Sequence, residues 1–330
     1  MNLQSQYLGM TLKNPLVPSA SPLSRDKDTC LRLEDAGASA LVMYSLFEEE
    51  LNTTHQRQMA LLEERDIGHS EAANFLPMHR EPSHALEQYL EQINRLTMHL
   101  SIPVIASLNG ISQDGWIDNA QLLAEAGADA LELNLYWVAA DPMISGVEME
   151  ARYLHLARAL RQVIDLPIMI KLSPYFSSLA HFVKQLEETG VNGVSLFNRF
   201  YQPDIDPDTL RVLANIHLSR SEDSLLSMRW LGILFGRTSM TLAATGGIHT
   251  AEDALKMLLA GADVTHLCSL LLEMGPRALT DILNGLERWL EDSPYDSLEQ
   301  ARGVLSHLHS DDPTLYERAS YVKLLTTGHY

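Results

Sequence analysis

The chain has few cysteines and no recognisable metal-ligand pattern, which excludes several kinds of redox and metal site. Its two cysteines, Cys30 and Cys268, are too few for an iron–sulfur cluster or a four-cysteine zinc site. The thirteen histidines show no ligand spacing such as H-E-x-x-H. We therefore expect no metal site and no disulfide, and any electron chemistry would need a bound organic cofactor.

Basic residues and long apolar runs are also scarce. The 24 lysines and arginines face 43 aspartates and glutamates, giving a formal net charge of −19 that would repel nucleic-acid phosphates. No run approaches the roughly 18 apolar residues of a membrane-spanning helix, and the start, MNLQSQYLGM, lacks the basic and apolar parts of a signal peptide. The sequence predicts a cytoplasmic protein with no nucleic-acid and no membrane partner.

A phrase made of a helix end, a glycine and a short apolar strand occurs four times. Its copies are EDAGASALVMYS at 34–45, AEAGADALELNL at 124–135, EETGVNGVSLFN at 187–198 and LLAGADVTHLCS at 258–269. Four more apolar runs, at 16–21, 103–108, 167–172 and 241–245, complete the set of strands. Such apolar strands are typical of parallel sheets covered on both faces. Eight strands alternating with helices predict an α/β fold, a (β/α)8 TIM barrel, with an open doubly wound sheet as the alternative.

The remaining segments predict helices, two long loops and a C-terminal extension. Helical patterns occur at 26–36, 84–100, 114–126, 148–164, 178–189, 251–260 and 276–290, and a hairpin with Gly9 at its turn opens the chain at 3–12. The stretches 46–83 and 199–228, after the second and sixth strands, are long enough to cover a site, although flexible surface insertions are the alternative. We expect one domain over 1–330, with the barrel at 14–290 and a helical extension at 291–330.

The stretch 241–269 predicts a phosphate site. Gly246 and Gly247 follow a strand and leave backbone N–H groups open to an anion. Thr250 and Asp253 form a capping box at the start of the next helix. Strand ends and a helix N-terminus thus meet at one place, as in barrels that bind phosphate on their last two loops. A plain strand–helix–strand unit with glycine turns is the alternative.

Small and polar residues gather where the predicted strands end. They are Ser19, Ala20, Ser21, Tyr44, Ser45, Asn109, Asn134, Lys171, Asn198, Gly246, Gly247, Cys268 and Ser269. Asparagine amides can hold the edge of a planar heterocycle, although each one could equally serve a turn or a cap. Lys171 is costly to bury unless a ligand charge meets it, and a salt bridge to Glu132 of the neighbouring strand is the alternative. Together these residues indicate a site in the barrel mouth.

A family resemblance rests on motifs that follow one another between residues 10 and 290. They are LKNPLVPSAS, LVMYS, ELNL, IKLSPYF, LFNRF, ATGGIHTAEDALKMLLAGAD and EMGP. Their order resembles the dihydroorotate dehydrogenase family, the FMN-dependent barrels of pyrimidine biosynthesis, and most of all its soluble class. The resemblance implies FMN as cofactor and hydride transfer from dihydroorotate, or a related cyclic amide, to the flavin. It also implies a small-molecule substrate, a homodimer, and an electron-transfer partner protein as an option.

The resemblance assigns roles to the strand-end residues. The FMN phosphate would lie on Gly246, Gly247, Cys268 and Ser269, and the flavin ring or ribityl chain near Ser19, Ala20, Ser21, Ser45, Asn109 and Asn134. Lys171 would lie near flavin N1 and stabilise the negative charge that develops on reduction. The substrate would contact Asn134 and Asn198, with Tyr44 and Asn74 nearest to two further substrate positions of the family.

The usual catalytic cysteine is missing. Soluble members read Asn-Leu-Ser-Cys-Pro-Asn after the fourth strand, where the cysteine is the base, whereas this chain reads NLYWVA at 134–139. The indole of Trp137 cannot accept a proton, so Tyr136 or Asp141 would have to replace the base. We assign catalysis to Lys171 and Tyr136. The alternatives are a barrel that binds FMN but has lost dehydrogenase chemistry and serves as a partner subunit, and a flavin-free sugar-phosphate isomerase or synthase.

Overall fold

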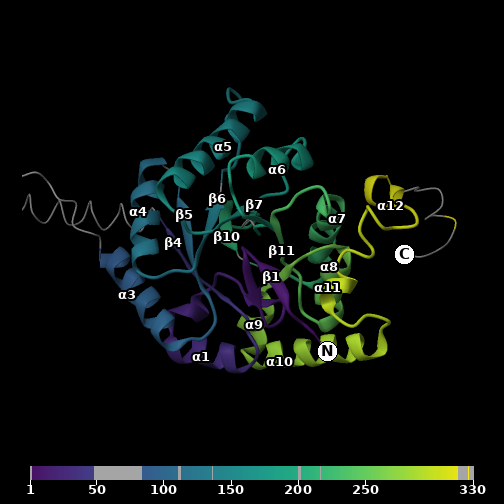
Figure 1. Cartoon of the computed structure of the whole chain (residues 1–330). Coiled ribbons are helices and arrows are strands. Elements are labelled where there is room, and N and C mark those ends of the chain that lie inside the picture. The colour runs from purple at the N-terminus through teal and green to yellow at the C-terminus, as the bar shows by residue number, and fades with distance from the viewer. Residues whose placement is uncertain are drawn as a thin grey trace, which may run out of the picture.

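Eight parallel strands form the centre of the molecule, and helices surround them (Figure 1). The computed structural model describes residues 2–47, 84–110, 113–135, 137–199, 202–215, 217–318 and 326. The strands are β3 (Leu16–Pro18), β4 (Leu41–Phe47), β5 (Val104–Gly110), β6 (Ala130–Leu135), β7 (Ile168–Leu172), β8 (Gly193–Leu196), β11 (Thr241–Thr245) and β12 (Val264–Leu267). All eight overlap the predicted segments, with β4 and β5 each ending two residues later than predicted, because each is a short apolar run bounded by turn residues.

The sheet is nearly closed into a barrel. Its order is β3-β12-β11-β8-β7-β6-β5-β4, so that each strand lies beside the preceding and following barrel strands of the chain. The two end strands approach each other just before β4, where Ser39 N donates to Leu16 O at 3.0 Å. An open doubly wound sheet would reverse its order in the middle. The unreversed order confirms the predicted (β/α)8 barrel and excludes the alternative.

Seven of the helices were predicted, and their apolar faces cover the sheet. They are α1 (Lys27–Asp35), α3 (His84–His99), α4 (Gln113–Glu125), α5 (Gly146–Val163), α6 (Leu179–Glu187), α8 (Ala251–Ala260) and α10 (Arg277–Asp292). In α10, Leu279, Ile282, Leu286 and Leu290 are buried at helical spacing. A short helix, α9 (Ser269–Met274), follows β12 and was not predicted. None of the helices in the described part of the chain is long and apolar enough to cross a membrane.

The connection after β8 differs from the prediction of one long loop at 199–228. It contains an antiparallel hairpin, β9 (Gln202–Asp206) and β10 (Arg211–Asn215), and the helix α7 (Ser224–Leu234) begins inside it. The sequence of α7, SLLSMRWLGIL, is apolar on most sides and therefore lacks the one-sided periodicity that reveals a surface helix. In the other predicted loop, residues 46 and 47 belong to β4, and 48–83 lie outside the described residues.

The opening hairpin closes the N-terminal end of the barrel. Strands β1 (Ser5–Tyr7) and β2 (Met10–Leu12) pair around Gly9, whose φ of +82° suits glycine. Tyr7, Leu8 and Leu12 are buried in a cluster with inward-facing residues from the first halves of the barrel strands. This confirms the predicted hairpin and makes the bottom of the barrel an apolar plug.

Above this plug the inside of the barrel becomes polar. Two residues further along the strands, on the same side, the side chains are Ser19, Ser107, Glu132, Lys171, Ser195, Thr245 and His266, all of them buried. Inward positions of a barrel are usually filled by branched apolar side chains. A polar layer directly beneath the C-terminal face therefore indicates where the barrel is built for chemistry.

Residues after α10 run along the outside of the barrel. Helices α11 (Leu298–Ala301) and α12 (Thr314–Glu317) lie against α8 and α7 respectively, at the yellow end of the chain in Figure 1. Gly303 N donates to Leu258 O at 3.0 Å, and Arg302 Nη1 lies 2.9 Å from Asp263 Oδ1. These contacts attach the extension to the last βα unit.

Candidate functional site

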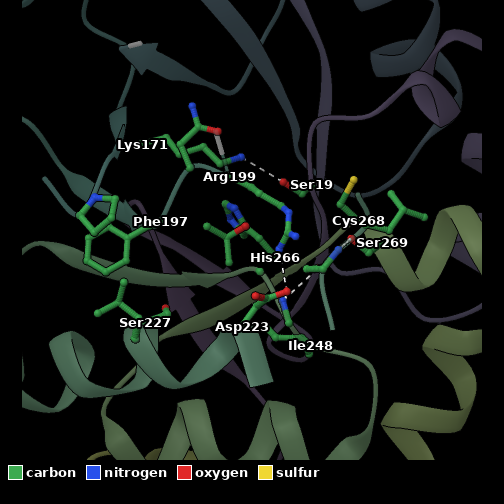
Figure 2. Close-up of a pocket in the computed structure, with 18 of the residues that line it drawn as sticks. Ser19, Lys171, Phe197, Arg199, Asp223, Ser227, Ile248, His266, Cys268 and Ser269 are labelled. Carbon is green, nitrogen blue, oxygen red and sulfur yellow. Dashed lines mark hydrogen bonds and ion pairs between the residues drawn. The ribbon is translucent and has the colours of Figure 1, made fainter. Parts of the chain in front are cut away.

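A pocket with a volume of about 560 Å³ opens at the C-terminal ends of the strands (Figure 2). This size suits a small molecule or a cofactor. Eight of the residues predicted from the sequence line it together: Ser19, Ala20, Lys171, Asn198, Gly246, Gly247, Cys268 and Ser269. They come from five different strand ends, so closure of the barrel is what brings them to one place.

Other predicted residues lie outside the described lining of this pocket. Ser45 on β4, Ser107 on β5 and Asn134 on β6 form a hydrogen-bonded group. Ser107 Oγ lies 2.8 Å from Ser45 Oγ and accepts a hydrogen bond from Asn134 Nδ2, also at 2.8 Å. Asn109 is half-buried at the end of β5. The roles predicted for these residues therefore depend on a ligand that extends from the pocket towards β4–β6.

Two predicted residues lie near the first helix. Ser21 is buried directly before a short 3-10 helix, and Tyr44 packs edge-on against Tyr89, with ring centroids 4.9 Å apart. The guanidinium of Arg25 lies over the Tyr44 ring at 4.4 Å. Asn74 and Tyr136 fall outside the described residues, so their predicted roles have no structural account.

Trp137, which follows Tyr136, faces the helices. Its ring meets Tyr153 of α5 edge-on, with centroids 4.8 Å apart, and Tyr153 in turn packs against Phe176 and Phe182. It does not belong to the described lining of the pocket. Asp141, the other candidate base, is exposed and accepts a hydrogen bond from Met143 N at 2.9 Å in the turn before α5. Neither side chain lines the pocket.

The two glycines after β11 have different tasks. At Gly246, with φ +89°, a Cβ would meet nothing within 4 Å, so the backbone is open to the pocket. At Gly247, with φ +72°, a Cβ would lie 2.4 Å from Ser224 N, so only glycine allows α7 to approach. Gly246 therefore presents an open backbone to a ligand, and Gly247 joins the strand end to α7.

Ser219, which the sequence analysis missed, lies between Gly247 and Ser269 and lines the same side of the pocket. Its Oγ accepts a hydrogen bond from Gly247 N at 3.1 Å and lies 2.7 Å from Ser269 Oγ. Ser219 N also donates to Ser269 Oγ at 3.0 Å. The signal was present in LSRSED at 218–223, which is rich in helix-capping residues, but it has meaning only once α7 is known to follow.

Asp253 of α8 stabilises this side of the pocket through hydrogen bonds to the segments that form it. Its carboxylate accepts hydrogen bonds from His249 N at 3.1 Å, Thr250 N at 3.0 Å and Ser221 Oγ at 2.8 Å. Burial pushes the pKa of Asp253 upwards, but these hydrogen bonds outweigh burial and hold it below the usual value. The predicted capping box is confirmed, and its aspartate also attaches the segment before α7 to α8.

Lys171 supplies a cation at the floor of the pocket. Its Nζ donates to Ser19 Oγ at 3.3 Å and lies 3.5 Å from Glu132 Oε1 (Figure 2 shows the contact with Ser19). The lysine is 7% exposed and Glu132 is 0% exposed. The salt bridge considered as an alternative is therefore present, yet Lys171 still lines the pocket.

Cys268 is a poor candidate for a base. Burial raises the pKa of its thiol, and the nearby charge of Lys171 opposes this only in part. Its Sγ lies 3.9 Å from Ala20 O. At the outer rim, Arg199 Nη1 is 2.7 Å from Asp223 Oδ2 (Figure 2), which places an ion pair that the sequence analysis did not identify beside Asn198.

The arrangement suits an anionic ligand. A buried ammonium, an open glycine backbone and the hydroxyl pair of Ser219 and Ser269 line one side of the pocket. Such groups bind phosphate or stabilise negative charge, because they offer N–H, O–H and ammonium donors away from bulk water. The buried Phe197 and the exposed Tyr175 add aromatic area to the lining, which suits a ligand with a planar ring.

Comparison with known proteins agrees with this geometry. The family model for dihydroorotate dehydrogenase matches residues 2–290. The NAD-dependent dihydropyrimidine dehydrogenase subunit PreA of Escherichia coli K12 is 26% identical over 324 residues, 93% of this chain and 77% of the relative. A putative dihydroorotate dehydrogenase A (fumarate) of Aeropyrum pernix is 30% identical over 235 residues, 69% of this chain and 73% of the relative.

A third relative is the catalytic subunit of dihydroorotate dehydrogenase B (NAD(+)) from Caldicellulosiruptor saccharolyticus. It is 21% identical over 311 residues, 93% of this chain and all of the relative. The family match covers every barrel strand from β3 to β12, and the strand order is that of a (β/α)8 barrel. The chain therefore belongs to the dihydroorotate dehydrogenase family, whose members are flavin-dependent dehydrogenases.

Proposed function

We propose that this protein is an FMN-dependent oxidoreductase that oxidises dihydroorotate, or a related cyclic amide, in the barrel mouth. The observation that carries the proposal is Lys171, an ammonium that is 7% exposed at the floor of a pocket of suitable size. A cation in this position is best used when negative charge develops beside it. When bound, FMN would supply the acceptor for the substrate hydride.

The residues of the pocket fit the two ends of this cofactor. The open backbone at Gly246 and the hydroxyls of Ser219 and Ser269 would hold the phosphate. Lys171 would lie under the ring with Ser19, and its charge would stabilise the reduced form. Asn198, half-buried on the lining, would orient the substrate through its amide.

The proton acceptor is proposed by elimination. The chain has no cysteine at 134–139, and burial raises the pKa of the Cys268 thiol, which leaves little thiolate at neutral pH. Asp141 is exposed outside the pocket lining. We therefore propose Tyr136 as the base, a residue outside the described part of the chain.

A protein partner for electron transfer is part of the proposal. Two of the relatives, PreA and the catalytic subunit of dihydroorotate dehydrogenase B, are by their names subunits of larger enzymes, and both names include NAD. We propose that this chain forms a homodimer and passes electrons to a partner protein. Size measurement of the protein alone and together with its candidate partners tests both parts.

Flavin content tests the cofactor. We expect about one FMN per chain in the purified protein, and we expect Gly246→Leu to remove it, because the new side chain would enter the open space beside the backbone. The matched control is Gly9→Leu. Gly9 has a similar φ, +82° against +89°, and equally open surroundings, but it lies on the hairpin at the other end of the barrel.

The two variants separate backbone strain from loss of the site. If both lose flavin, strain alone explains the result and the phosphate site is not supported. If Gly246→Leu keeps its FMN, the phosphate lies elsewhere. A wild-type protein that stays colourless with added FMN would contradict the whole proposal and would favour the flavin-free sugar-phosphate enzyme.

A further inference from the structure

Behind Lys171 lies a row of buried polar side chains that the proposed chemistry does not use. Glu132 Oε1 is 3.5 Å from Lys171 Nζ, and Glu132 Oε2 is 3.5 Å from His266 Nδ1. On its other side, His266 Nε2 is 3.2 Å from the hydroxyl of Tyr7. Tyr7, Glu132 and His266 are all at most 1% exposed. The row leads from the hairpin at the bottom of the barrel to the pocket floor.

The protonation states along this row follow from burial. Burial, and then the charge of Glu132, raises the pKa of Tyr7 well above its usual value, so its hydroxyl keeps its proton, and we assign this hydroxyl as the donor to His266 Nε2. Burial lowers the pKa of His266 to about 4, so the ring is neutral at pH 7. We assign its proton to Nδ1, which then faces Glu132.

The polar layer of the barrel contains buried atoms that still lack a hydrogen bond. Among the described residues, Glu132 Oε2, His266 Nδ1 and Ser195 Oγ are buried without a hydrogen-bond partner, and all three belong to the polar layer. Leaving such groups unsatisfied is costly. A shift of a few tenths of an ångström, or one water, would connect His266 Nδ1–H to Glu132, so these atoms point to a functional arrangement.

We propose that Glu132, held in place by His266 and Tyr7, is a positioning residue that fixes the Lys171 ammonium at the pocket floor and offsets its charge there. The inference rests on the proposed function, because its effect is read at the flavin. The Glu132 carboxyl lies 3.5 Å from the Lys171 ammonium, and the neutral His266 adds no charge to the floor. A lysine without this partner would hold reduced flavin more strongly.

Variants on the two sides of the ion pair should therefore shift the flavin potential in opposite directions. In the FMN-loaded protein, Glu132→Gln should favour reduced flavin at least tenfold, which is about 30 mV upwards for a two-electron couple. Lys171→Met should favour oxidised flavin by a similar factor, and the double variant should lie near the wild type. The control is Glu252→Gln, which breaks the exposed ion pair of Glu252 with Lys256 on α8 (2.6 Å) and should change nothing.

The role of His266 is tested by comparing two substitutions, one that keeps its hydrogen bonds and one that removes them. An amide offers both a donor and an acceptor, so His266→Gln should keep the wild-type potential, whereas His266→Leu should shift it in the direction of Glu132→Gln. A merely structural histidine would lower stability in His266→Leu without moving the potential. An unchanged potential in Glu132→Gln, or equal shifts in the Leu and Gln variants of His266, would overturn the proposal.

A second readout separates this inference from the proposed function. Imidazole nitrogen NMR of the purified protein should find His266 as the neutral Nδ1–H tautomer from pH 7 down to pH 5, with or without bound FMN, and this preference should weaken in Glu132→Gln. A protein that binds no flavin but passes this test contradicts the proposed function and leaves the arrangement of Glu132 and His266 supported. Protonation of His266 near pH 6.5, or the opposite tautomer, would overturn the inference.

Discussion

His266 should make the stability of the protein depend on mild acid. Burial lowers its pKa to about 4, against about 6.5 in an unfolded chain. Between these two pH values the unfolded chain binds a proton at His266 and the folded protein does not. The part of the free energy of unfolding that comes from the neutral His266 is fully present above pH 6.5 and is lost as the pH falls towards 4. One such group predicts a loss of about 2 kcal/mol in the free energy of unfolding between pH 7 and pH 5.

Urea unfolding at the two pH values measures this loss. In His266→Gln, whose side chain does not titrate, the difference between pH 7 and pH 5 should shrink by about the same 2 kcal/mol. The exposed His155 of α5 provides the control, since His155→Gln should leave the pH dependence unchanged. An undiminished difference in His266→Gln would mean that other groups cause the acid sensitivity.

At single positions, the sequence predicted side chains well where a strand end alone determines the location. Lys171 was predicted to face a ligand or to pair with Glu132; the structure shows the pair with Glu132 and also places Lys171 on the lining of the pocket. His266 was missed, although it lies near the end of β12, only two residues before Cys268, and both line the pocket. Its partners, Glu132 and Tyr7, are more than a hundred residues away in the chain, a distance that only closure of the barrel removes.

At the level of elements, Asp253 connects α8 to the segment before α7. Replacing Asp253 with Ala removes the partner of His249 N, Thr250 N and Ser221 Oγ at once. We expect the free energy of unfolding to fall by about 1–3 kcal/mol, the usual range for a cap combined with buried unpaired donors. Weaker FMN binding should accompany this loss, because Ser219 lies in the released segment.

Glu252→Ala in the same helical turn is the matched control. Glu252 is more exposed and forms an i,i+4 ion pair with Lys256, so its loss should cost about 0.5 kcal/mol or less. Chemical unfolding and FMN titration of both variants measure the two effects. If Asp253→Ala binds FMN as tightly as the wild type, the segment before α7 does not contribute to the cofactor site.

The elements predicted and missed differ in the pattern they carry. Strands and amphipathic helices were identified because alternation and one-sided periodicity are local properties. α7 is apolar around most of its circumference, being buried against the barrel at Leu231 and Leu234 and covered by the C-terminal segment. Its missing periodicity therefore reflects burial on two sides. Because α7 was not predicted, the sequence analysis also missed the hairpin β9–β10 and Ser219, which precede it.

At the scale of the whole molecule, the chain combines a family barrel with the sequence NLYWVA at 134–139, where the family resemblance implies a catalytic cysteine. The barrel could be predicted because the alternation of strands and helices repeats along the chain. The composition of the site could be predicted only in part, since the distances between strand ends depend on closure and on which side chains turn inwards. Trp137 illustrates this limit: its place after β6 suggested the catalytic position, but its ring packs against Tyr153 on the helix side.

The most direct test of the central claim is an anaerobic titration of the FMN-loaded protein with dihydroorotate, dihydrouracil and similar cyclic amides. We predict that at least one of them bleaches the visible flavin absorbance and is converted to its oxidised form. If no residue replaced the usual cysteine, bleaching should be about a hundredfold to ten-thousandfold slower than with an ordinary base, so a faster rate would need a substitute such as Tyr136. Cys268→Ala should leave the rate nearly unchanged once flavin is saturating. If dithionite bleaches the flavin and no cyclic amide does, the barrel has kept its cofactor and lost the dehydrogenase chemistry, and the account is contradicted.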